Sequence, residues 1–314
     1  MAHGLDRPIR LLPIFRERVW GRNDLAPWFP VTPRQGRIGE VWFTFEKNST
    51  SLGRPLEEVL IDHPEILGSA GDPRRPWICP LLVKLLFTSE PLSVQVHPDD
   101  AYASEHHESL GKTEAWYVLE AEPESAVAVG LRETIDAQQF RRAAQSGEIE
   151  TLLAWKKVKP GDVVFVPAGT VHAIGAGLAI CEIQENSDIT YRIYDYGRPR
   201  ELHLNEGVAV AKLGPVRRQD EPLRLAARRE QLHANEYFRI ERLRPTRTLH
   251  IPGDLAYYLL LICVKGSGEI AGEPFQAGEA WMAPAGGSAI QIDGSDAEWI
   301  LTYSAHQPAA GITL

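Results

Sequence analysis

The stretch that ends at His97 carries two side chains that can bind a metal ion. Residues 92–97 read Leu-Ser-Val-Gln-Val-His and alternate as a β-strand does, so Gln95 and His97 lie on one face. Pro98 cannot continue a paired strand, so we expect the strand to end just past the histidine. An amide and an imidazole would then project from one strand end into the same space.

A second stretch, residues 111–119, places a lysine and a carboxylate on one face of another strand. The same alternation brings Lys112, Glu114 and Trp116 together. If the two strands are adjacent, imidazole, carboxylate, amide and ammonium groups share one space, and such a set can hold a divalent metal beside an anionic substrate. Taken alone, each stretch is also explained by an ordinary β-strand with a polar rim.

A further histidine belongs to a segment that is repeated later in the chain. Residues 161–172 align without gaps on residues 278–289, with the glycines, an acidic residue and a proline at matching positions. These glycines and prolines indicate turns around a short apolar strand. His172 in the first copy is replaced by Ala289 in the second. The simplest explanation is two copies of one barrel module, the first with a polar site; a chance match of turn residues is the alternative.

The elements that position these residues are predicted to be mostly short strands. Later strands put Glu182 on one face with Gln184, and Arg192 on one face with two tyrosines. Turn residues recur about every 8–12 residues, which favours a sandwich or barrel over a parallel sheet. Helices are predicted over residues 55–62, 134–146, 149–155 and 202–213. Thr134 is the expected N-cap of the second of these helices, and Gly147 is expected to end it.

These elements predict two domains. Residues 1–214 would form the metal-binding domain, with a small helical insertion at 131–157, and residues 215–230 would form a linker. Residues 231–314 would form a second barrel without metal, whose interior Trp281 and Trp299 could fill. The second barrel would then act as a buttress that covers apolar surface of the first.

The composition indicates a soluble globular protein. The chain has 314 residues, 44% of them hydrophobic, and a formal net charge of −9. This charge, without a compensating basic stripe, argues against nucleic-acid or membrane partners. The three cysteines lack metal-finger spacing and predict buried thiols in a reducing compartment. The N-terminal residues contain no apolar signal core. We therefore expect a cytoplasmic protein that is a monomer or a small homo-oligomer.

The motifs resemble a known family of enzymes. The segment from Gly161 to His172 looks like the second motif of the cupin superfamily of small β-barrels. The longer stretches resemble type I mannose-6-phosphate isomerase in its short bacterial form; they are residues 18–21, 38–42, 91–101, 111–119 and 191–203. The resemblance implies a mainly β fold of two cupin-type (jelly-roll) β-barrels. The loop between Asp195 and Glu201 is shorter than in many relatives, which could alter the rim of the site.

The resemblance also implies a set of site residues. The zinc ligands of the family, one ion per chain, fall on Gln95, His97, Glu114 and His172. Its substrate-site arginine falls on Arg192, its lysine on Lys112, and a further acidic residue on Glu182. Arg192 would bind substrate and stabilise charge, Lys112 would contact phosphate or transfer a proton, and Glu182 would be an acid or base. In the alternative, Arg192 pairs structurally with Asp195 or Glu182, and Glu182 only orients its neighbours.

The implied reaction interconverts mannose 6-phosphate and fructose 6-phosphate. It moves a proton between C1 and C2 through a cis-enediol(ate) without a redox cofactor, and a Lewis-acid metal stabilises the developing charge. A cupin isomerase of another sugar phosphate is one alternative. An iron-dependent oxygenase is a second, although such sites favour more histidine ligands. A non-catalytic sugar-binding cupin is the third, and it would not need Lys112, Glu114 and Arg192 in one cavity.

Overall fold

A computed structural model describes residues 5–30, 36–216 and 221–314, and most of its elements are β-strands. The helices are α1 (Leu56–Asp62), the 3-10 helix η1 (Pro64–Leu67), α2 (Asp100–His107), α3 (Ala137–Ser146), α4 (Ile149–Leu152) and α5 (Leu204–Val210). Within the described residues, hydrogen bonds between strands define three open sheets and no closed barrel. The prediction of a mainly β protein is confirmed. No helix in these ranges is long and apolar enough to cross a membrane.

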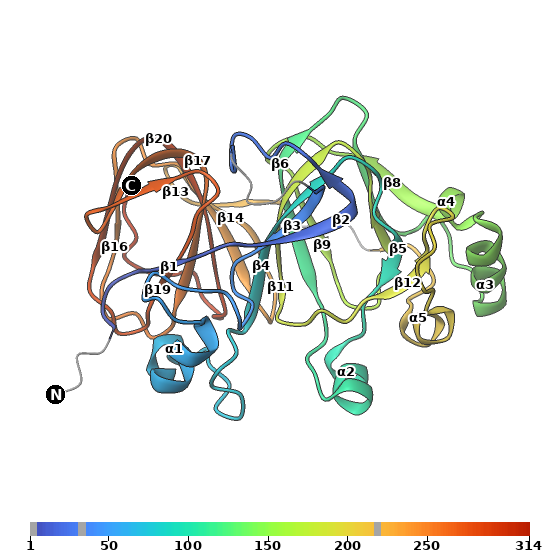
Figure 1. Cartoon of the computed structure of the whole chain (residues 1–314), viewed down its shortest axis with the longest axis horizontal. Helices are drawn as coiled ribbons and strands as arrows, with labels where there is room; N and C mark the ends of the chain where they lie inside the picture. Colours follow the sequence, from blue (N-terminus) through green and yellow to red (C-terminus); the bar gives the residue numbers. More distant parts are fainter. Residues whose placement is uncertain (1–4, 31–35, 217–220) are drawn as a thin grey trace.

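The first sheet lies at the centre of the molecule (Figure 1). Its six strands, in order, are β2 (Ile14–Arg22), β3 (Ile38–Trp42), β4 (Leu81–Thr88), β11 (Leu178–Glu185), β6 (Glu114–Ala121) and β9 (Val163–Val166). Alternation along β11 sends Cys181 and Ile183 to one face, where they join a large apolar cluster. Glu182 and Gln184 point to the opposite face, as the sequence predicts.

The second sheet carries both histidines of the predicted site. Its strands, in order, are β12 (Tyr191–Tyr194), β5 (Val94–Val96), β10 (His172–Ile174), β7 (Ala126–Leu131) and β8 (Leu153–Lys157). Val94 and Val96 pack into an apolar cluster with residues of α3, which lies at the far right of Figure 1 with α4 and α5. The residues between and after these valines, Gln95 and His97, therefore face the first sheet.

The space between the first two sheets is apolar at one end and polar at the other. Trp116 and Ile180 of the first sheet and Val127 and Ile174 of the second belong to one buried cluster. The polar residues lie on the same inner faces, further along the strands. The cluster thus excludes water from one end of the space, whereas charged side chains occupy the other.

The third sheet is built mainly from the C-terminal part of the chain. Its main path is β1 (Ile9–Leu11), β19 (Ala280–Ala283), β17 (Leu259–Ile270), β20 (Ile290–Tyr303), β15 (Arg239–Leu243), β14 (Arg229–Ala234) and β13 (Leu223–Ala226), with β16 (Thr248–Ile251) on β20 and β18 (Glu273–Gln276) on β17. Strand β1 comes from the other end of the chain and pairs with β19. Trp281 and Trp299 are fully buried in a cluster within this sheet, as predicted.

The repeat that the sequence predicts is matched by the backbone. Strands β9 and β19 occupy aligned positions of the two copies and have the same length. The glycine that precedes each strand has nearly the same left-handed backbone, with φ of 91° at Gly161 and 93° at Gly278. Only glycine adopts this conformation without strain. The agreement favours two related segments over a chance match of turn residues.

Several predicted element bounds differ from the structure. Helix α3 begins at Ala137, and its N-cap is Asp136, not Thr134, because Asp136 and Gln139 form a reciprocal capping box. The helix predicted over 149–155 ends at Leu152 and is followed by β8, which pairs with β7. Helix α5 covers only the middle of the predicted 202–213 range. The segment 215–230, predicted as a linker, contains β13 and the start of β14, while residues 217–220 lie outside the described ranges.

Deletion of residues 221–314 should give an insoluble or unfolded product. One apolar cluster joins Val83, Phe87 and Cys181 of the first sheet to Ile240 and Leu260 of the third. Removal of the third sheet would expose this face to water, and large exposed apolar patches cause aggregation. Solubility and circular dichroism of the fragment ending near residue 214 test this expectation. A soluble, folded fragment would contradict the buttress role of the third sheet.

Candidate metal centre and active site

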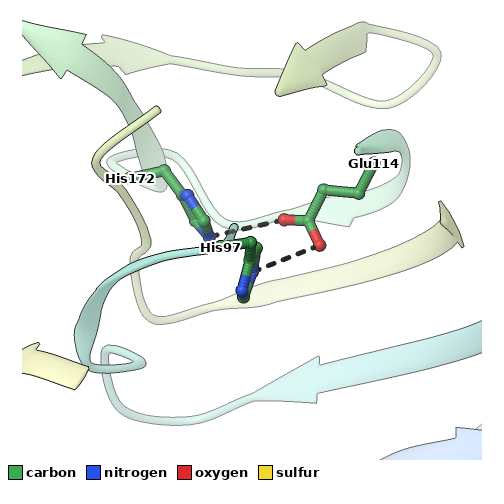
Figure 2. Close-up of side chains that lie close together, drawn as sticks. All are labelled: His97, Glu114 and His172. Carbon is green, nitrogen blue, oxygen red and sulfur yellow. Dashed lines mark ion pairs between the residues drawn. The ribbon is translucent and has the colours of Figure 1, made fainter. Parts of the chain in front are cut away.

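Three side chains that can bind a metal converge between the first two sheets. Figure 2 shows His97, Glu114 and His172 pointing toward one another. One ligand atom from each lies within 4.8 Å of the others, and each residue is at most 1% exposed. His97 follows β5, Glu114 begins β6 and His172 begins β10, so both sheets contribute to the group.

The two histidines present unprotonated ring nitrogens to this group. Nδ1 of His97 lies 2.9 Å from the carbonyl oxygen of Ile189, and Nδ1 of His172 lies 2.8 Å from that of Thr170. A carbonyl only accepts, so each Nδ1 carries the hydrogen and each Nε2 keeps a lone pair. Burial lowers the pKa of His97 well below its usual value and that of His172 to about 4. Both rings are therefore neutral near pH 7, which is the form that binds a metal.

Glu114 faces both rings and is not fully satisfied by the protein. Its Oε1 lies 3.4 Å from Nε2 of His172, and its Oε2 lies 3.5 Å from Nε2 of His97. Among the described residues, Glu114 Oε1 and His172 Nε2 have no hydrogen-bond partner. A buried polar atom without a partner costs about 1–3 kcal/mol. A divalent cation among these atoms would satisfy both, so the residues fit a metal ion.

Gln95 lies beside this group. In the second sheet it is directly opposite His172 on one side and Arg192 on the other. Residues that are directly opposite in a sheet project from the same face. The structure thus brings Gln95 to the face that carries His172, and Gln95 also lines the cavity described below.

Lys112 connects the histidine–glutamate group to a cavity. Its Nζ lies 3.0 Å from Nε2 of His97 and 3.1 Å from Oε2 of Glu114. Burial acts to lower the pKa of this amine, but the negative charges of Glu114 and Glu182 outweigh burial and raise it. Lys112 therefore remains protonated near neutral pH.

The cavity is charged and has a volume of about 530 Å³. Its lining includes four of the predicted site residues, Gln95, Lys112, Glu182 and Arg192, together with Arg18, Glu40, Lys84, Asp188 and Arg200. Cationic side chains from both sheets face the same space. The cavity can therefore hold a small, polar, anionic molecule next to the candidate metal group.

Glu182 is buried between a lysine and a tryptophan. Its Oε2 lies 3.4 Å from Nζ of Lys84, and its Oε1 accepts a hydrogen bond of 3.3 Å from Nε1 of Trp116. Burial, followed by the charge of Glu114, raises the pKa of the Glu182 carboxyl. Lys84 is not among the site residues predicted from the sequence. Its position inside a continuous apolar run is the signal that could have identified Lys84. In the structure Lys84 lies directly opposite Glu182 in the sheet.

Arg192 lines the cavity and has one nitrogen without a partner among the described residues. It donates a 2.8 Å hydrogen bond from Nη1 to the carbonyl oxygen of Glu201, whereas its Nε is buried with no partner among the described residues. The Asp195 carboxylate, a predicted structural partner, instead receives two hydrogen bonds of 2.6 Å from Arg200. This geometry leaves Arg192 able to donate to an anion.

A second arginine–carboxylate pair forms the opposite wall. Arg18 donates from Nε and Nη2 to the two carboxylate oxygens of Glu40, at 2.9 and 3.0 Å. Burial acts to raise the pKa of Glu40, but the charges of Lys84 and Arg18 outweigh burial and lower it. Both residues belong to stretches that resemble the family, but neither is among the site residues predicted from the sequence.

Comparisons with known proteins give the family. Residues 9–141 match the family described as phosphomannose isomerase type I, catalytic domain. Two Bacillus subtilis proteins are similar to the chain over most of its length. Mannose-6-phosphate isomerase ManA is 34% identical over 94% of this chain and 98% of its own, and the probable mannose-6-phosphate isomerase GmuF is 33% identical over 93% and 98%. The chain belongs to the mannose-6-phosphate isomerase family.

The fold agrees with this membership. The crystal structure of the mannose 6-phosphate isomerase from Bacillus subtilis superimposes with a TM-score of 0.86 at 31% identity, and it covers 95% of this chain and 99% of that one. The family resemblance predicted from the motifs is thus confirmed. The matched segment 9–141 contains Gln95, His97, Lys112 and Glu114, while His172 and Arg192 lie beyond it.

The metal-free chain should lose stability as the pH falls from 6.5 to about 4. The pKa of His172 is about 4 in the folded chain and near 6.5 in the unfolded one, so the unfolded chain binds more protons across this window. Buried His97 adds a contribution of the same sign. The loss attributable to His172 is at most about 3 kcal/mol. Denaturant unfolding with chelator should give a shallower pH slope for His172→Gln, and equal slopes would contradict the expectation.

Proposed function

We propose that this chain is a metal-dependent aldose–ketose isomerase that interconverts mannose 6-phosphate and fructose 6-phosphate. The observation that carries the proposal is the position of Lys112, which contacts His97 and Glu114 and also lines the charged cavity. A substrate in the cavity would lie within reach of the metal group. The names of the two Bacillus relatives support this sugar phosphate, and a different phosphorylated sugar is the alternative.

The proposed cofactor is one zinc ion per chain, with Gln95, His97, Glu114 and His172 as its ligands. Two neutral imidazoles, one carboxylate and one amide oxygen suit zinc. The unpartnered buried atoms of Glu114 and His172 support the assignment. When bound, zinc would supply positive charge that stabilises negative charge developing on a sugar oxygen.

The remaining work would fall to the residues that line the cavity. A base must remove the C2 proton of mannose 6-phosphate and a proton must return to C1, through a cis-enediol(ate). The raised pKa of Glu182 brings its carboxyl closer to the neutral range, which suits this acid–base role. Lys112 stays protonated and would stabilise charge or donate a proton to a sugar oxygen. Arg192, which lines the cavity, would bind the phosphate or the enediolate through its guanidinium.

Two rival functions are less consistent with the site. His97, Glu114 and His172 are also a two-histidine, one-carboxylate set, which iron oxygenases use. The Lys112 ammonium beside two of these residues and the charged cavity favour a phosphorylated substrate over oxygen chemistry. A sugar-binding cupin would have no use for a lysine buried against the metal group. Oxygen consumption after loading with iron separates the first rival from isomerisation.

We extend the proposal to the architecture and the setting of the protein. The aligned strands β9 and β19 support two cupin-type (jelly-roll) modules, residues 1–214 carrying the site and residues 231–314 acting as a metal-free buttress. The three cysteines are buried free thiols, which agrees with a reducing cytoplasm. The active unit would be a monomer or a small homo-oligomer.

Loss of a histidine ligand should abolish metal retention. The purified chain should hold one divalent ion, and His97→Ala or His172→Ala should remove it. Gln95→Ala should weaken retention less, because a neutral amide is the poorest ligand of the set. His250→Ala, on the exposed side of β16, is the matched control. Elemental analysis reads out the metal, and full activity of the demetallated chain would refute the proposed metal dependence.

Loss of the arginine should reduce isomerisation by orders of magnitude. Removal of a charged contact costs about 2–5 kcal/mol, so Arg192→Ala should lower kcat/KM accordingly. Arg224→Ala, exposed on β13, should leave kcat/KM unchanged. A coupled assay on mannose 6-phosphate and fructose 6-phosphate, with and without chelator, measures both. If the metal-loaded chain incorporates no solvent deuterium at C1 or C2 of either sugar, the proposed function is wrong.

A further inference from the structure

Three consecutive backbone N–H groups, those of residues 111–113, fix the segment that carries Lys112 and Glu114. The hydrogen bonds run from Gly111 to Asp100 Oδ1 at 2.8 Å, from Lys112 to the Pro98 carbonyl at 3.0 Å, and from Thr113 to Glu185 Oε2 at 2.7 Å. A Cβ at Gly111 would lie 2.5 Å from the backbone nitrogen of Asp100, so only glycine permits this close approach. The backbone of the segment therefore has little freedom to move.

The Glu185 side chain takes the place of a backbone hydrogen-bond acceptor at the end of the pairing between β6 and β11. The paired residues of β6 and β11 end where Glu114 faces Gln184. One step further, the N–H of Glu185 donates to the carbonyl of Thr113 at 3.1 Å, but the N–H of Thr113 donates to the Glu185 side chain. Thr113 and Glu185 are each 4% exposed. With almost no water available, the Thr113 N–H depends on this carboxyl for its partner.

Two further polar side chains lie near Glu185. They are Asp100 of α2, whose Oδ1 accepts from the Gly111 N–H, and Tyr237, in the turn between β14 and β15. All three residues line one small cavity of about 180 Å³. Burial, with a contribution from the Asp100 charge, raises the pKa of Glu185 to about 8. With the pKa raised, the carboxyl is largely uncharged near pH 7, and its Oε2 accepts from the Thr113 N–H.

We propose that Glu185 is a positioning residue that fixes Lys112 and Glu114 through Thr113. Successive residues of an extended segment point to opposite faces. A hydrogen bond that fixes the Thr113 backbone therefore also fixes the direction in which the side chains of Lys112 and Glu114 point. The inference rests on the proposed isomerase function only for its kinetic consequences, because the position of Glu114 also determines metal affinity.

The decisive comparison is Glu185→Ala with Glu185→Gln. Alanine leaves the Thr113 N–H without an acceptor, whereas glutamine mimics the uncharged acid and keeps a side-chain oxygen that can accept from Thr113. Glu185→Ala should lower kcat about tenfold or more with KM nearly unchanged, because small displacements of catalytic groups are costly. Its zinc affinity, measured by chelator competition, should fall as well. Glu185→Gln should restore both, and Glu279→Gln, in the turn between β18 and β19, is the control.

A pH profile separates positioning from a purely structural role. Above about pH 8 the wild-type Glu185 ionises beside Asp100, and the repulsion should weaken zinc binding and kcat, whereas Glu185→Gln should lack this alkaline loss. The other charged groups at the same cavity are Asp72, Arg75 and Tyr237. Tyr237→Phe should cause a smaller loss of kcat than Glu185→Ala, and Tyr257→Phe, stacked on Tyr303 away from the site, should cause none.

The outcomes are distinguishable from failure of the proposed function. If wild type isomerises no sugar phosphate, the function is wrong, and zinc affinity alone decides the role of Glu185. If Glu185→Ala matches wild type in zinc affinity and kcat, or if Glu185→Gln is damaged equally, positioning is refuted. Should Glu185→Ala fail to fold, the zinc-binding pH profile of Glu185→Gln against wild type decides. If wild type and Glu185→Gln lose zinc affinity to the same extent above pH 8, the inference is wrong.

Discussion

The structure depends on compensating the charge of Glu114, a carboxylate that is buried between two sheets. The residue is fully buried, and the burial of an unpaired carboxylate costs several kcal/mol. Lys112 supplies one compensating charge at 3.1 Å, and two neutral histidines leave lone pairs that a cation can share. Glu114, both histidines and Lys112 are all buried, which strengthens the charge interactions among them, and the apolar cluster keeps water out of the other end of the inter-sheet space.

The first sheet serves two purposes because successive side chains of its strands point to opposite faces. Cys181 and Ile183 of β11 pack toward the third sheet, whereas Glu182 between them reaches the cavity. The same strand therefore belongs both to the core and to the site. A substitution on the core face would shift the strand and with it the charged face, so packing and chemistry cannot be altered independently here.

The sequence predicted the residues whose placement depends on local geometry. Strand alternation brought together Gln95 with His97, and turn residues placed His172 at the start of a strand. Lys84 was not predicted as a site residue because its contact with Glu182 depends on the register between β4 and β11, and these strands are distant in the sequence. The bounds of α4 and β8 were missed because short apolar runs fit helix and strand equally well.

The pairing of β1 with β19 has a consequence for the order of folding. Ile9–Leu11 leaves the ribosome long before Ala280–Ala283 is synthesised, yet the two strands are hydrogen-bonded in the finished protein. The edge of the third sheet is completed only when almost all of the chain has been translated. One edge of β1 can pair earlier with residues 49–51, to which it is bridged at Leu11 and Thr50. Its other edge stays unpaired until β19 is made, and an unpaired strand edge invites contact with other nascent chains. Pairing between segments this far apart in the sequence is slow to form, because a long loop must close first.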